Sequence, residues 1–111
     1  MNEQQARQLA SNEALFRTVN EKIVGLNETF ESLAQSCAFL CECSHIGCIE
    51  QVELTLAEYE HVRGNPRRFI LAPSQEHLVA EIDLVVEQTS RYFIVEKHGA
   101  AADEVERLAA E

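Results

Sequence analysis

All four cysteines of this chain of 111 residues lie within the segment Cys37-Ala-Phe-Leu-Cys41-Glu-Cys43-Ser-His45-Ile-Gly-Cys48. A lone cysteine is commonly a small, buried core residue. Cysteines gathered this closely indicate a metal-binding site, because thiolates are preferred ligands of zinc. We expect a reducing, cytoplasmic setting, in which clustered cysteines favour metal binding or redox chemistry over disulfides. The cluster therefore predicts a small fold built around a metal knuckle.

Three of these cysteines, Cys41, Cys43 and Cys48, have a spacing that suits metal ligands, Cys-x-Cys-x4-Cys. Cys41 and Cys43 are two residues apart, so their side chains share one face of an extended strand. Cys48 follows a loop that contains Gly47, a residue type suited to a tight turn. Because structural zinc sites are tetrahedral and use four Cys or His ligands, one more ligand is expected.

The fourth ligand has three candidates. His77 is placed first, because it belongs to a segment that can fold over the knuckle from elsewhere in the domain. Cys37 comes second, since on a strand it shares the face of Cys41 but lies about 13 Å from it. His45 comes third, because the loop leaves its ring little room. The two remaining histidines are expected to be solvated: His61 and His98.

The predicted role of the metal is structural, and the chain is expected not to be an enzyme. Three thiolates make a poor Lewis acid, and Glu42 should point away from Cys41 and Cys43 rather than act as a general base. No Lys or Arg lies between Lys22 and Arg63 to activate a thiol. A second hypothesis is a redox or metal sensor, because oxidation of metal-bound thiolates releases the metal.

Residues 1–34 predict one long helix. Its apolar residues recur at steps of three and four and so share one face: Leu15, Val19, Ile23, Leu26, Phe30 and Leu33. Polar residues, among them Glu13, Arg17 and Asn20, occupy most of the remaining surface. The apolar stripe either covers the sheet of its own domain or pairs with a second copy or a partner helix.

The rest of the chain predicts short strands, one short helix and a tail. Strands are expected at 38–41, 49–54, 68–72, 82–87 and 91–97. Thr55 and Glu58 have the spacing of a capping box at the start of a short helix. The tail from residue 98 either forms a frayed helix or remains disordered.

Together these elements predict an α+β fold with a long N-terminal helix and a small, mostly antiparallel sheet. The metal knuckle is expected at a hairpin tip, between the first two strands. We expect a single domain that spans 1–111, with the helix at 1–34, the knuckle and α+β core at 37–97 and the tail at 98–111.

The charge of the chain restricts its partners. Nineteen acidic residues against nine Lys and Arg give a formal net charge of −10. Nucleic-acid binding depends on basic residues, so none is expected. No apolar run approaches the length of a membrane span, and the first residues do not have the charged-then-apolar pattern of a secretion signal, so no membrane contact is expected. The expected partner is a protein, with a basic surface, or a second copy bound through the N-terminal helix.

Two motifs resemble those of a family of small bacterial proteins of unassigned function. They are Phe39-Leu-Cys41-Glu-Cys43-x4-Cys48 and Leu54-Thr-Leu-Ala-Glu-Tyr-Glu-His-Val-Arg63. Matching residues around 12–21, 72–73 and 91–97 extend the resemblance over most of the chain. It implies that Cys41, Cys43 and Cys48 act as a set and that Cys37 is peculiar to this chain. The family pattern has Gly-His-Glu after Ala-Pro, where this chain has Ser-Gln-Glu-His77.

Overall fold

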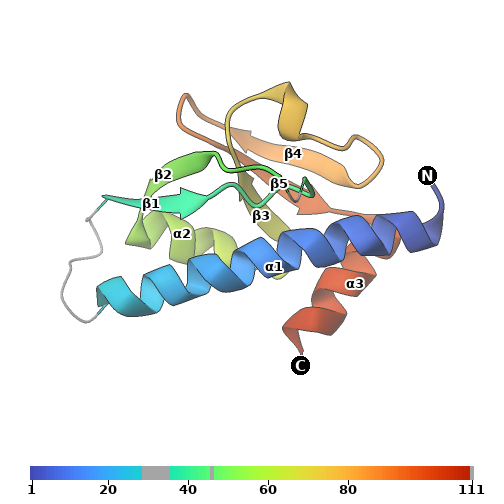
Figure 1. The fold of residues 1–111 in the computed structure, drawn as a ribbon, viewed down its shortest axis with the longest axis horizontal. Coiled ribbons are helices and arrows are strands. Elements are labelled where there is room, and N and C mark those ends of the chain that lie inside the picture. The colour runs from blue at the N-terminus through green and yellow to red at the C-terminus, as the bar shows by residue number, and fades with distance from the viewer. Residues whose placement is uncertain (29–35, 46, 111) are drawn as a thin grey trace.

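The computed structural model describes residues 1–28, 36–45 and 47–110 (Figure 1). The helices are α1 (Glu3–Glu28), α2 (Leu56–Arg63), the 3-10 helix η1 (Gln75–His77) and α3 (Gly99–Ala109). The strands are β1 (Ser36–Leu40), β2 (Gln51–Thr55), β3 (Arg68–Leu71), β4 (Asp83–Gln88) and β5 (Phe93–Lys97). The predicted helix at 1–34 is thus helical from Glu3 to Glu28, and residues 29–34 lie outside the described part of the chain.

The strands form two antiparallel sheets. β1 pairs with β2, and the second sheet has the order β3-β5-β4. β5 is central and buried, whereas β4 is an edge strand with a register shift between Val85 and Glu87. The predicted α+β class is confirmed, with the cysteine segment joining β1 to β2 (Figure 1).

The face that α1 buries differs from its predicted apolar stripe, of which Ile23 packs against the core but Leu15 and Val19 do not. Leu15 is 58% exposed and Val19 is 39% exposed, whereas Glu13, Arg17 and Asn20 are buried. Hydrophobic periodicity identifies an amphipathic helix but not the partner of each face, and here the polar face finds hydrogen-bonding partners in the core. The predictions for the side chains of Leu26, Phe30 and Leu33 fall outside the described residues.

Arg17 shows how α1 buries a cation. Its guanidinium donates to the carbonyls of Asn65 (3.2 Å) and Pro66 (3.0 Å) and lies 4.5 Å from the centre of the Phe69 ring. Carbonyl acceptors and an aromatic face together replace the water that the guanidinium loses. The contact attaches the middle of α1 to the α2–β3 connection.

Glu13, Asp83 and Lys97 form a buried ionic cluster on the same face of α1. The Lys97 ammonium contacts both carboxylates and thereby joins α1 to β4 and β5. One Glu13 oxygen, Oε1, makes no hydrogen bond. Burial raises the pKa of Glu13 to about 8, in opposition to the attraction of Lys97.

The tail after β5 forms a helix rather than remaining disordered. α3 packs on the N-terminal half of α1 (Figure 1), with Ala101, Ala102 and Val105 buried. Ala6 and Ala10 are the buried apolar residues of α1 in this half, and their small side chains allow close approach. The helix begins at Gly99, whose φ of 64° lies in the left-handed region that favours glycine.

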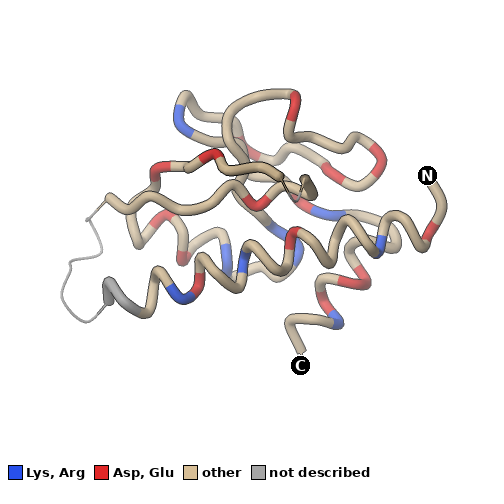
Figure 2. Tube along the Cα trace, in the orientation of Figure 1, with Lys and Arg blue, Asp and Glu red and all other residues tan. Residues whose placement is uncertain are grey.

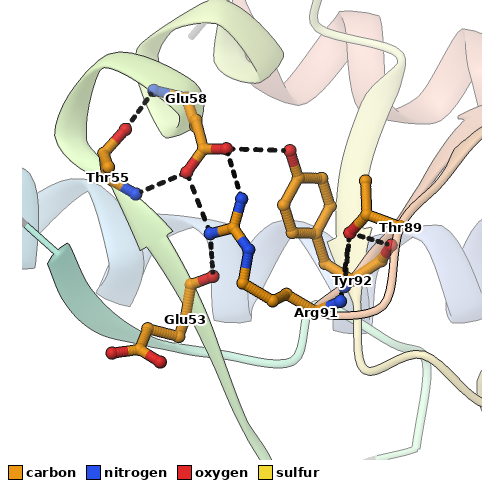
Figure 3. Close-up of polar contacts among 6 residues, drawn as sticks. All are labelled: Glu53, Thr55, Glu58, Thr89, Arg91 and Tyr92. Carbon is orange, nitrogen blue, oxygen red and sulfur yellow. Dashed lines mark hydrogen bonds and ion pairs between the residues drawn. The ribbon is translucent and has the colours of Figure 1, made fainter.

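The predicted capping box at the start of α2 is confirmed. The Thr55 hydroxyl accepts the Glu58 N–H (3.1 Å), and the Glu58 carboxylate accepts the Thr55 N–H (2.8 Å). The same carboxylate accepts bonds from Arg91 (2.7 and 3.1 Å) and the Tyr92 hydroxyl (3.2 Å) (Figure 3). Arg91 also donates to the Glu53 carbonyl, so this cluster joins the β4–β5 turn to β2. The hydrogen bonds from Arg91 lower the pKa of Glu58 to about 2.

Candidate metal centre

Four potential ligand atoms converge beside the β1–β2 connection. They belong to Cys41, Cys43, Cys48 and His77, and all lie within 4.8 Å of one another. The Nδ1 atom of His77 is 3.6 Å from Cys41 Sγ and 3.8 Å from Cys48 Sγ. Tetrahedral zinc, with bonds of about 2.3 Å to sulfur and about 2.0 Å to nitrogen, would separate such atoms by about 3.5 Å. The four side chains are therefore close enough to hold a metal ion.

Backbone hydrogen bonds hold two of the three cysteines, Cys41 and Cys48, in place. The Cys41 N–H donates to the Glu50 carbonyl (3.0 Å), which continues the β1–β2 pairing by one step. The Cys48 N–H donates to the His45 carbonyl (2.9 Å) and closes the turn between them. Gly47 does not adopt a positive φ, since Gly99 alone does so among the described residues, and a Cβ at Gly47 would contact nothing within 4 Å. The turn therefore does not require the positive φ that glycine permits, contrary to our expectation.

Glu42 anchors the segment from the side opposite the sulfurs. Its carboxylate is fully buried and accepts hydrogen bonds from the Tyr59 hydroxyl, the Asn20 amide (2.9 Å) and the Ile70 N–H (3.0 Å). The Glu42 N–H in turn donates to the Ile70 carbonyl (2.8 Å). Burial raises the pKa of Glu42, and these donors oppose that rise. Glu42 thus points away from the sulfurs, as expected, but into a buried set of hydrogen bonds, a structural role that the sequence analysis missed.

The turn after β3 brings His77 to the cysteines. The Ala72 N–H donates to Cys41 Sγ (3.2 Å), so the end of β3 is itself attached to one of the sulfurs. Ser74 then caps η1 by accepting the Glu76 N–H (3.3 Å), and η1 carries His77. One turn of chain therefore both supports a sulfur and supplies the ring nitrogen.

The other ring nitrogen of His77 lies beside a carboxylate. His77 Nε2 is 3.2 Å from Glu50 Oε2, although the two are not aligned as a hydrogen bond. A carboxylate near the outer nitrogen of a metal-binding imidazole favours the tautomer that leaves the inner nitrogen free to bind. Glu50 is a second residue that sequence reasoning missed. The sequence could have indicated this role, because Glu50 lies only two residues after Cys48.

The alternative fourth ligands lie elsewhere. Cys37 is buried in β1 opposite Leu54, and His45 is exposed and contributes its carbonyl to the turn. Neither belongs to the group of four atoms. His61 and His98 are exposed, as expected.

The three thiols share their negative charge unequally. A hydrogen bond from Cys41 lowers the pKa of Cys43 to about 4, and the same interaction, with burial, raises the pKa of Cys41. Burial raises the pKa of Cys48 as well. Sulfurs this close cannot all ionise unaided, because each thiolate repels the next. A divalent cation would compensate that repulsion, and its binding would release the remaining protons.

Comparisons with known proteins add no further information about this site. No protein-family model, no curated protein and no solved structure matches the chain. The resemblance to the bacterial family therefore stays a prediction. Among the described residues, no helix is both long enough and apolar enough to cross a membrane.

Proposed function

We propose that this chain is a non-enzymatic module, stabilised by zinc, that binds another protein. The convergence of Cys41, Cys43, Cys48 and His77 carries the proposal. Three soft thiolates and one imidazole are a donor set typical of structural zinc. Four protein ligands complete a tetrahedron and leave no position open for a substrate, which favours a structural role over a catalytic one.

The zinc in this proposal fastens two parts of the fold to each other. Cys41, Cys43 and Cys48 come from the β1–β2 connection, and His77 comes from η1 after β3. A small domain has a limited core, so a metal cross-link between its sheets adds stability that burial alone does not supply.

The proposed contact surface is the outward face of α1. Leu15 and Val19 are exposed there, and a hollow beside Leu15 is also lined by Thr18 and Leu108. Exposed apolar side chains with polar neighbours are typical of interaction sites. Acidic residues are spread over the helices and strands (Figure 2), so a partner with a basic rim around an apolar contact would be attracted. A second copy of the chain is the other candidate partner.

Elemental analysis of the purified protein tests the metal part of the proposal. We expect one zinc ion per chain, lost in Cys41→Ser and Cys43→Ser and retained in Cys37→Ser, whose cysteine lies outside the group of four. A chain that purifies without zinc and binds none on addition would refute it.

A matched pair of surface variants tests the partner. Leu15→Asp with Val19→Asp should abolish capture of a protein partner or, for self-association, reduce the mass measured by sedimentation. Leu84→Asp is the control, because Leu84 on β4 is 56% exposed, close to the 58% of Leu15. Equal loss in the control, or a monomer that captures nothing, would count against this part of the proposal.

A further inference from the structure

The four candidate ligands differ in how far solvent reaches them. Cys41 and Cys43 are 1% and 0% exposed, whereas Cys48 is half-buried. Cys48 also lines a hollow at the surface, shared with His45, Gly47, Ile49, Glu50, Glu76 and His77. A small molecule from solution therefore meets the sulfur of Cys48 before the other two.

Hydrogen bonding and nearby charge add to this difference between the sulfurs. The hydrogen bond from the Ala72 N–H to Cys41 Sγ (3.2 Å) withdraws charge from that sulfur and weakens it as a nucleophile. Glu50 and Glu76 line the hollow beside Cys48, so an anionic reagent is repelled and a neutral one is not. Oxidation follows thiolate character and exposure. When a metal holds all three sulfurs ionised, exposure is what distinguishes them, and it favours Cys48.

We propose that Cys48 is the site at which a neutral peroxide oxidises this centre, and that the disulfide formed there releases the metal. The inference rests on the proposed metal centre. It assigns the exposed sulfur a function that a purely structural cross-link would not have.

The chemistry has two steps. The Cys48 thiolate attacks one oxygen of hydrogen peroxide, the O–O bond breaks, and a sulfenic acid and hydroxide are formed. The thiolate of Cys41 or Cys43 then attacks the Cys48 sulfur, the S–O bond breaks, and a disulfide and a second hydroxide result. Two thiolates lose two electrons in total, and the peroxide gains them. The ion keeps one sulfur and one imidazole, too few ligands to retain it.

Hydrogen bonds outside the metal site also hold the segment that carries the cysteines. Glu42 remains bonded to Asn20, Tyr59 and Ile70 whether or not the sulfurs bind an ion. Release of the ion should therefore loosen residues 43–45, 47–48 and η1, while the strands on either side stay paired. The change is local, and reduction of the disulfide reverses it.

The test treats the zinc-loaded protein with hydrogen peroxide and follows zinc release with a chromogenic chelator. We expect one zinc released per chain, a disulfide that includes Cys48 on peptide mapping, and an unchanged far-ultraviolet circular dichroism spectrum. Cys37→Ala should behave like the unaltered protein. Cys48→His, which keeps a fourth ligand but removes the accessible sulfur, should retain zinc and release it at least about tenfold more slowly.

Alkylation of the unaltered protein gives a second readout that depends on no variant. Iodoacetamide should label Cys48 first, and the anionic iodoacetate should label it more slowly than the neutral reagent. First labelling of Cys41 or Cys43, or equally fast zinc release from a folded Cys48→His protein, would overturn this inference while zinc binding stands. A protein that binds no zinc at all would overturn the proposed function as well.

Discussion

The side chain of Asn20 on α1 hydrogen-bonds both backbone groups of Leu40, the last residue of β1. Its amide oxygen accepts the Leu40 N–H (2.8 Å), and its amide nitrogen donates to the Leu40 carbonyl (2.9 Å). Asn20 thus takes the place of a residue on a neighbouring strand at the point where β1 turns toward the cysteines. The same amide nitrogen also donates to Glu42. One helix residue therefore orients the segment that carries the sulfurs.

Replacing this amide should destabilise the protein without changing the ligands. In Asn20→Ala, backbone groups of Leu40 lose their partners, so we expect the free energy of unfolding to fall by about 2–3 kcal/mol. Urea unfolding of the zinc-loaded protein measures the change. Asn12→Ala is the control, because Asn12 donates one half-buried bond to the Ser44 carbonyl and accepts one exposed bond from Gln8, so its loss should cost about 1 kcal/mol. Equal losses in the two variants would contradict the special role of Asn20.

Removing the buried cation should be costly. Lys97→Met removes the only cation among the described residues that contacts Glu13 and Asp83, and the negative charge that this acidic pair carries is then buried without a partner, so we expect a loss of about 3–5 kcal/mol in unfolding free energy. Adding Glu13→Gln and Asp83→Asn to Lys97→Met should restore most of it, because no buried charge then remains. Thermal and urea unfolding report both changes. A triple variant no more stable than Lys97→Met would show that the cluster acts through packing instead.

Glu13 should make stability depend on pH. Its pKa is raised from 4.5 to about 8 in the folded state, so the folded protein keeps a proton that the unfolded chain loses. The contribution of Glu13 to the unfolding free energy should therefore be fully present below pH 4.5 and should be lost as the pH rises through 8. Glu13→Gln cannot ionise and should lack this fall. Urea unfolding of the unaltered protein and of Glu13→Gln, both zinc-saturated, at pH 6 and pH 9 measures this difference. The prediction is wrong if the two proteins show the same pH dependence.

Glu50 should tune metal affinity through His77. In Glu50→Gln the carboxylate that faces His77 Nε2 is lost, so zinc affinity should fall about 10–100-fold. Competition with a chelator of known affinity measures it. Glu76→Gln removes an equal charge from the same hollow and is the matched control, with a smaller effect expected. Parallel losses in the two variants would assign the effect to charge near the site and not to orientation of the ring.

Features that depend on near neighbours in sequence could be predicted. The capping box needs only Thr55 and Glu58, three residues apart, and the structure contains it. The alternation of Cys41, Glu42 and Cys43 likewise determined that the carboxylate and the sulfurs have different partners. The strands, the two hairpin pairings and the α+β class follow from short-range patterns of the same kind, whereas the pairing of β3 with β5 and the division into two sheets do not.

The buried face of α1 and the fourth ligand atom were decided only in three dimensions. Periodicity marks Leu15 and Val19 as one stripe, but Arg17 is buried because the carbonyls of Asn65 and Pro66 lie beside it, nearly fifty residues away along the chain. His77 reaches the sulfurs because β3 ends next to Cys41. A sequence shows which groups need partners, whereas tertiary packing brings distant groups close enough to become those partners.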